Sequence, residues 1–225
     1  MAATTKKPKG LVANGIELVL TVAIAIGLAL LIQAFLVKPY RIPSGSMIPT
    51  LSIGQRILVN RLDTQPGLGD IVVFHPPTSA VNGDGNGACG NPAQGVNAEG
   101  VARPQACAKN VPTESNQTFV KRVVGLPGDH LKIIDGYVYR NGVKEHLAYN
   151  LRAALATQGF LPCTKGTTSD CTFSRTITVP AGEYYMMGDN RGDSLDSRYW
   201  GPVPQKWIIG VAFGTYWPID RIGFF

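Results

Sequence analysis

The longest apolar segment of the chain is the feature that most limits how it can fold. Residues 18–37 are apolar apart from Thr21, Gly27 and Gln33. As a helix, these 20 residues rise about 30 Å, which is the hydrocarbon thickness of a bilayer. Three lysines lie within the first ten residues, as in a secretory signal, but the apolar core of a cleaved signal is usually only about 7–15 residues long. The sequence therefore predicts an uncleaved transmembrane helix, and not a removed signal or a buried core helix.

The charges that flank this segment give the expected orientation and division of the chain. Lys38 and Arg41 follow the span closely, so the positive-inside rule only slightly favours a cytoplasmic N-terminus. We expect residues 1–14 to form a cytoplasmic tail, residues 15–37 a transmembrane anchor, and residues 38–225 an extracytoplasmic domain.

The overall charge indicates which partners the chain can have. The net charge of +6 is modest, and no dense basic stripe is present. Such a balance suits anionic lipid head groups better than nucleic acid. Nothing in the sequence resembles a zinc finger or an RNA-binding aromatic motif. We therefore expect no nucleic-acid partner, no bound metal and no cofactor.

The four cysteines form two pairs that are local in sequence. Neither pair has the C-x-x-C spacing of a zinc or redox site. An even number of cysteines in an extracytoplasmic domain predicts the disulfides Cys89–Cys107 and Cys163–Cys171. Four reduced, inert thiols are the alternative, and thiol titration of the unreduced protein distinguishes the two.

Beyond the span, short apolar runs separated by Gly- and Pro-containing turns predict a mostly β domain. The pair Asp135-Gly136 between two such runs is a hairpin signal. Residues 76–118 contain many Gly, Asn, Pro and Ala residues with little periodicity, which indicates a long loop or an inserted lobe. The expected strands cover residues 57–59, 71–74, 119–124, 131–134, 137–139, 176–179, 184–187 and 207–213.

Ser46 is a candidate nucleophile in the stretch PSGSMIPTL at residues 43–51, where flanking prolines discourage a helix. A serine hydroxyl is a weak nucleophile until a base removes its proton. His75, His130 and His146 stand at a strand end, in a turn and in a polar segment, which are settings typical of surface histidines. The residues around Ser46 also match neither the G-x-S-x-G elbow nor the S-x-x-K pattern of penicillin-binding enzymes.

Lys121 is the candidate base, in the stretch FVKRVVGLPGD at residues 119–129. On a strand it shares a face with Phe119 and Val123, while Arg122 points the other way. Lysine between two large apolar side chains is unusual and indicates burial. Burial disfavours the charged form, so it lowers the pKa of a lysine from its ordinary value of about 10.4 toward neutrality.

At these residues the chain resembles the bacterial type I signal peptidases, the serine/lysine leader peptidase family. The resemblance covers roughly residues 15–225, and it also rests on GDIVVF at residues 69–74 and on GDNRGDSLDSRYWG at residues 188–201. The chain departs from the family pattern at Gly192 and in the length of the 76–118 insertion. The resemblance implies a coiled, β-barrel-like catalytic domain behind a single transmembrane helix.

The resemblance also implies a role for individual residues of the catalytic site. Ser46 matches the family's nucleophile and Lys121 its general base. The Ser44 hydroxyl and the Ser46 backbone N–H match the oxyanion hole. Ser194 matches the serine that hydrogen-bonds and orients the lysine, and Asp196 and Arg198 match a pair that supports the site.

The remaining matches concern substrate selection. Members of the family cut preproteins after a small residue, with another small residue two positions earlier. The apolar side chains that match the small-residue pockets, or are ordinary core residues, are Ile42, Met47, Phe119 and Val120.

The resulting hypothesis is a serine endopeptidase that removes N-terminal signal peptides by a Ser46/Lys121 dyad. Its partners are signal-peptide-bearing preproteins and the lipid bilayer, with the secretion translocon as a further candidate. It is expected in the plasma (inner) membrane, spanning it once, with the catalytic domain on the extracytoplasmic side.

One alternative is a specialised relative, of the conjugation or organelle type, that cuts few substrates. Another is a membrane-tethered scaffold that lost turnover, although intact Ser46, Lys121 and Ser194 speak against it. A self-cleaving repressor also uses serine and lysine, but the anchor and the lack of a helix-turn-helix argue against that.

Overall fold

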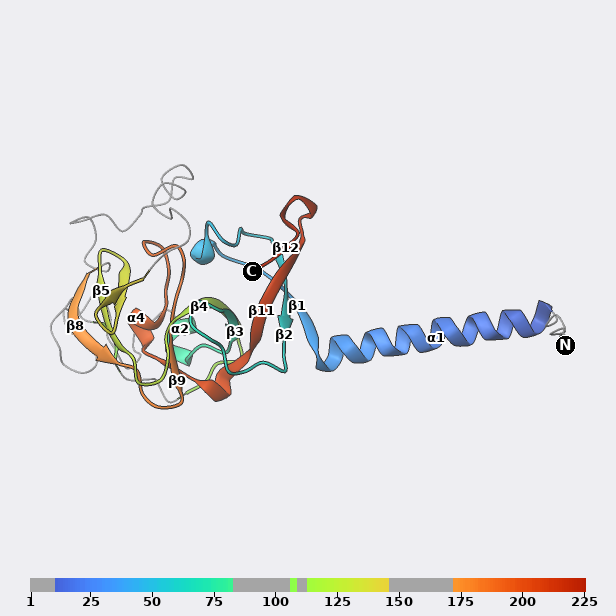
Figure 1. The fold of residues 1–225 in the computed structure, drawn as a ribbon, viewed down its shortest axis with the longest axis horizontal. Helices are drawn as coiled ribbons and strands as arrows, with labels where there is room; N and C mark the ends of the chain where they lie inside the picture. Colours follow the sequence, from blue (N-terminus) through green and yellow to red (C-terminus); the bar gives the residue numbers. More distant parts are fainter. Residues whose placement is uncertain (1–10, 83–105, 109–112, 146–171) are drawn as a thin grey trace, which may run out of the picture.

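The N-terminal helix stands apart from the rest of the molecule. The computed structural model describes residues 11–82, 106–108, 113–145 and 172–225. Helix α1 (Leu11–Phe35) projects from a β-rich body as a single rod (Figure 1). Its window Asn14–Leu31 is long and apolar enough to cross a membrane, and none of that window is buried in the protein. Lipid can cover such a surface, because a helix satisfies all its own backbone hydrogen bonds.

The ends of this helix differ from the expected limits of the anchor. Residues 11–14, expected in the tail, are helical, since Leu11, Val12 and Ala13 extend the apolar segment toward the N-terminus. Val37, expected to end the anchor, instead begins β1 (Val37–Arg41), where it pairs with Asn60. The first ten residues of the expected tail, 1–10, lie outside the described residues.

The larger of the two sheets is antiparallel, and it carries most of the strands. Its order is β1-β2-β11-β3-β4-β9-β10, with β12 paired to β11. Beyond β1, its strands are β2 (Arg56–Asn60), β3 (Ile71–Phe74), β4 (Phe119–Gly125), β9 (Glu183–Met187), β10 (Val203–Pro204), β11 (Ile208–Trp217) and β12 (Gly223–Phe224).

A second sheet has the order β7-β6-β5-β8 and begins with a hairpin. Asp135 and Gly136, both with positive φ (51° and 78°), form the turn between β5 and β6, as their sequence predicts. The strands are β5 (His130–Ile134), β6 (Tyr137–Arg140), β7 (Val143–Lys144) and β8 (Phe173–Thr178).

The expected mostly β fold is confirmed, with local differences. Each expected apolar run forms a strand, but Val179 lies beyond β8 and Trp207 lies in the 3-10 turn η4 (Gln205–Trp207). The short strands β7, β10 and β12 were not expected, because runs of two residues carry no periodicity.

Buried apolar side chains from both sheets form the core. One cluster joins Val72 and Phe74 of β3 to Trp200 and Trp207. A second fills the space between β9 and the smaller sheet, around Leu131. Trp200 and Trp207 are therefore core residues, whereas Trp217, at the end of β11, is about half exposed.

The described ends of the 76–118 insertion are joined at its base. Pro77 forms a bridge with Glu114, and Ser115 N–H donates to the Pro76 carbonyl. A short helix, α2 (Thr78–Asn82), begins there. Cys107 is disulfide-bonded and fully buried. Cys89, Cys163 and Cys171 lie outside the described residues, so both disulfide pairings stay predictions.

Candidate active site

Ser46 lies in a tight turn that is held from two sides. The turn is the 3-10 helix η1 (Gly45–Met47), closed by a hydrogen bond from Ile48 N–H to the Gly45 carbonyl. Asn190 binds the same turn, because its N–H donates to the Ser46 carbonyl (3.0 Å) and its Nδ2 to the Gly45 carbonyl (3.2 Å). The backbone that carries the hydroxyl is thus fixed by a loop 145 residues further along the chain.

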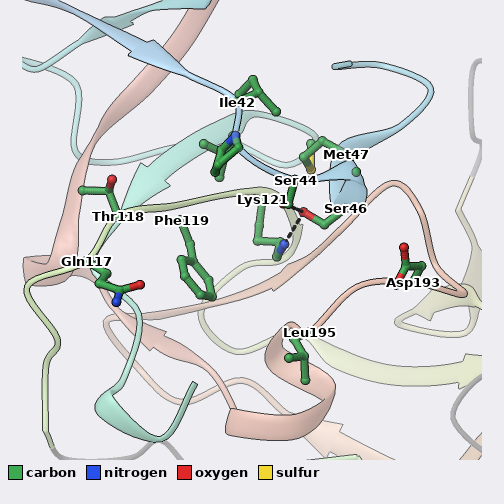
Figure 2. A pocket seen from close by; sticks show the side chains of 13 residues that line it. Ile42, Ser44, Ser46, Met47, Gln117, Thr118, Phe119, Lys121, Asp193 and Leu195 are labelled. Atoms are coloured by element: carbon green, nitrogen blue, oxygen red, sulfur yellow. Dashed lines mark hydrogen bonds between the residues drawn. The ribbon is translucent and has the colours of Figure 1, made fainter. Parts of the chain in front are cut away.

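Lys121 reaches Ser46 from the middle of β4. Its side chain is only 4% exposed. Its Nζ lies 2.6 Å from Ser46 Oγ and is hydrogen-bonded to it (Figure 2). Nζ also lies 5.8 Å from the centre of the Phe119 ring, as expected for two residues on the same face of a strand. The structure therefore brings the two expected catalytic side chains into direct contact.

The surroundings of Lys121 favour its neutral form. Burial lowers the pKa of Lys121 from 10.5 to about 8, against the opposing effect of the Asp196 carboxylate. Arg198 acts in the same direction as burial. A lysine with such a pKa is substantially neutral at mildly alkaline pH, so it can accept a proton from a hydroxyl.

Asp196 and Arg198 form a fully buried ion pair beside the lysine. Arg198 Nε donates to Asp196 Oδ1 (2.8 Å) and its Nη2 to Oδ2 (2.9 Å). Although burial opposes ionisation, the Arg198 guanidinium holds the pKa of Asp196 below its usual range. Asp196 Oδ2 also accepts from Gly188 N–H, and Arg198 donates to the Arg191 and Ser194 carbonyls. The pair thus organises the whole loop from residue 188 to residue 198.

Ser194 does not make the hydrogen bond to Lys121 that the resemblance implied. Its Oγ is buried and has no hydrogen-bond partner among the described residues. The hydroxyl instead packs where a side chain on Gly188 would stand. Lys121 Nζ is hydrogen-bonded to Ser46 Oγ, and the orienting role of Ser194 stays a prediction.

Ser44 lies beside the candidate nucleophile on the exposed side. The two hydroxyl oxygens, Ser44 Oγ and Ser46 Oγ, are 3.4 Å apart. Ser44 is exposed and adopts an extended backbone conformation directly before η1.

A cavity of about 390 Å³ opens around the dyad. This volume is within the range of small-molecule and peptide side-chain sites. All four residues expected to form the small-residue pockets contribute to its walls. These lining residues are Ile42, Met47, Phe119 and Val120.

Three polar contacts were not identified from the sequence. Arg122 donates through Nε and Nη2 to the Asp189 carboxylate, both at 2.7 Å. Arg191 forms an ion pair with Glu145, which ties the loop to the smaller sheet. Asn190 holds the η1 turn as described above. All three involve the polar run GDNR at residues 188–191, whose composition suggests a surface turn although Asp189, Asn190 and Arg191 are buried.

Comparisons with known proteins show what the chain is similar to. A family model described as "Signal peptidase, peptidase S26" matches residues 15–217. A probable signal peptidase I-2 of Synechocystis is 33% identical over 211 residues, covering 92% of this chain and 76% of that protein. A signal peptidase I of Leptolyngbya laminosa is 32% identical over 225 residues, covering 99% and 88%. A probable thylakoidal processing peptidase 2 of Arabidopsis thaliana is 27% identical and covers 88% and 43%.

Proposed function

Because this chain belongs to the signal peptidase family, peptidase S26, we propose that Ser46 is its nucleophile and Lys121 its general base. The chain is a membrane-bound serine endopeptidase that cleaves N-terminal signal peptides from exported preproteins. The observation that carries the assignment of residues is the 2.6 Å contact between Lys121 Nζ and Ser46 Oγ in a buried site.

Acylation begins at the Ser46 hydroxyl. Its oxygen attacks the scissile carbonyl carbon while its proton passes to the neutral Nζ of Lys121. Collapse of the tetrahedral intermediate breaks the peptide C–N bond, and the Lys121 ammonium returns the proton to the departing amine. The signal peptide remains as an ester on Ser46, and the mature protein leaves with a free N-terminus.

Deacylation uses the same base in a second round. A water molecule attacks the ester carbonyl and gives its proton to Lys121. Collapse then expels Ser46 Oγ, which takes the proton back. The resting state is restored with both groups neutral, so no third titrating group is required.

The developing oxyanion needs hydrogen-bond donors on the exposed side of Ser46. The Ser44 hydroxyl, 3.4 Å from Ser46 Oγ, and the Ser46 backbone N–H are the proposed donors. Removal of one such donor typically costs about 2.7–4 kcal/mol in the barrier. The contact between the two hydroxyls supports this assignment, since it places Ser44 next to the reacting oxygen.

The apolar walls of the cavity support selection of small side chains. Ile42, Met47, Phe119 and Val120 leave room for alanine, and they reject larger side chains by steric overlap. We assign these residues to the positions before the scissile bond, where a signal peptide carries its small residues.

The exposed apolar helix supports an anchored enzyme, with α1 crossing the plasma (inner) membrane and the β-rich body on its extracytoplasmic side. Anchoring holds the site beside the bilayer in which the apolar part of a signal peptide lies. Enzyme and substrate then meet within a thin layer, which raises their effective concentration.

The test is cleavage of a preprotein that carries Ala-x-Ala before the cleavage site, using the full chain in detergent. Ser46→Ala and Lys121→Met are expected to abolish cleavage while circular dichroism stays unchanged. Lys132→Met is the matched control, because Lys132 is an exposed lysine on β5. Full activity in either dyad variant, or equal loss in the control, contradicts the assignment.

A further inference from the structure

The cavity that holds the dyad also contains a carboxylate that the mechanism does not use. Asp193 lines the cavity and is exposed. Its carboxylate makes no hydrogen bond or ion pair with any residue that the structure describes. Its backbone is nevertheless held, because Asp193 N–H donates to the Asn190 carbonyl (3.0 Å), and Asn190 in turn binds the nucleophile turn. The backbone of Asp193 is therefore held beside the dyad, and its carboxylate is free to interact with a ligand.

The position of Asp193 relative to the dyad assigns it to one half of the substrate. Figure 2 shows Asp193 and Leu195 on one side of the Ser46–Lys121 contact, and Ile42 and Thr118 on the other. The side with Ile42 carries the apolar walls that we assign to the residues before the scissile bond. A polypeptide bound across Ser46 must then pass Asp193 with the residues that follow the scissile bond.

We propose that Asp193 is a specificity-determining residue that favours basic over acidic side chains among the first two residues of the mature protein. This proposal rests on the proposed function and deepens it. A lysine or arginine side chain at these positions gains an attractive charge, whereas aspartate or glutamate meets a like charge. Because Asp193 is exposed, water and salt screen the interaction, and the expected preference is about fivefold in kcat/KM.

The electrostatic influence of Asp193 extends to the dyad itself. It is one of the carboxylates that raise the pKa of Lys121 against the effect of burial. A change at Asp193 can therefore alter the rate on every substrate through the base. The ratio of kcat/KM between two substrates measured with one variant cancels this common effect and isolates the contact with substrate.

The experiment uses three preproteins that are identical except for Lys, Gln or Glu at the first position after the cleavage site, and a second set varied at the next position. The full-length enzyme is expected to cleave the Lys substrate about fivefold better than the Glu substrate, in at least one set. Asp193→Asn is expected to bring the ratio close to one, and Asp193→Lys to invert it. The control is Asp220→Asn, which is expected to leave the ratio unchanged. Asp220 is an exposed acid on the turn η5 (Ile219–Arg221), outside the cavity.

The outcomes separate this proposal from the function on which it rests. If the Gln substrates are not cleaved, or are cleaved equally by Ser46→Ala, the proposed function is wrong. If cleavage depends on Ser46 but the Lys to Glu ratio is near one, only the role of Asp193 is overturned. The same holds if Asp193→Asn shifts the pH profile without changing the ratio. A ratio that falls in 1 M salt supports a charge contact, and a ratio that salt leaves unchanged contradicts it.

Discussion

The Asp196 carboxylate and the Arg198 guanidinium pair through two hydrogen bonds, of 2.8 and 2.9 Å, and both side chains are almost completely buried. Among the charges that raise the pKa of Lys121, the Asp196 carboxylate has the largest effect. Arg198 acts on the pKa of Lys121 in the opposite direction, so the two charges of the pair partly offset each other. Burial has the largest effect, and it sets the pKa of Lys121 at about 8.

Arg198→Met tests this balance. The substitution leaves a buried carboxylate without its partner, which typically lowers the free energy of unfolding by about 3–5 kcal/mol. The unpaired Asp196 also stabilises the Lys121 ammonium, so the onset of activity is expected to move to higher pH. Chemical denaturation and a pH profile of kcat/KM measure the two effects.

The control for this variant is Arg140→Met. Arg140 pairs with Asp129 at 3.1 Å, but its side chain is 37% exposed. An exposed pair contributes at most about 1 kcal/mol. Equal losses of stability in the two variants contradict the view that burial makes the Asp196–Arg198 pair important.

The pH dependence of the reaction follows from the pKa of about 8 for Lys121. Only the neutral amine accepts a proton, so below this pKa the active fraction falls tenfold for each pH unit. We expect log kcat/KM to rise with unit slope up to about pH 8 and then to level off. A rate that rises only above pH 10 means that the base is an ordinary solvated lysine. Lys132→Met is expected to leave the profile unchanged.

The sequence predicts the strand, the face and the burial of Lys121, because these depend only on the alternation of neighbouring residues. It cannot predict which distant group meets that lysine. The contact with Ser46 depends on β4 lying between β3 and β9, with Lys121 opposite Val72 and the residue 188–198 loop closing over the turn. The resemblance to a family supplied that partner.

The same resemblance implied a hydrogen bond from Ser194 to Lys121, and the described part of the structure does not contain that hydrogen bond. It also did not indicate Asn190, whose amide holds the nucleophile turn. Polar residues in a Gly- and Asp-rich run suggest a solvated turn, and only the packing of the loop beneath η1 buries them. Contacts that depend on such packing have no local signal.

The burial of Lys121 costs stability at neutral pH. In the unfolded chain its pKa is 10.5, so between pH 8 and pH 10.5 the unfolded state binds more protons than the folded state. Stability of the wild type therefore rises with pH across this window. Below pH 8 the cost is fully present, at about 3 kcal/mol for a shift of this size.

Lys121→Met removes that cost and is expected to stabilise the protein. The variant lacks activity, yet at pH 7 its free energy of unfolding is expected to exceed that of the wild type by about 3 kcal/mol. The difference shrinks as the pH approaches 10.5. Denaturant titrations at pH 7 and pH 10.5 measure it, with Lys132→Met as the exposed control. If the variant is less stable than the wild type at pH 7, burial of the Lys121 amine does not lower the free energy of unfolding.

Gly188 lies where the loop, the nucleophile turn and Ser194 meet. A Cβ at this position stands closer than 3.0 Å to Ser194 Oγ and to the Ser46 carbonyl oxygen, and the second of these is backbone that cannot rotate away. Gly188→Ala is therefore expected to displace Ser46 from Lys121 and to lower kcat/KM by about 100-fold, since small misplacements cost this much. Gly67→Ala is the matched control, because its nearest neighbour is at an ordinary 3.6 Å. Near-wild-type activity of Gly188→Ala, measured on the same preprotein, contradicts the close packing of the loop against the dyad.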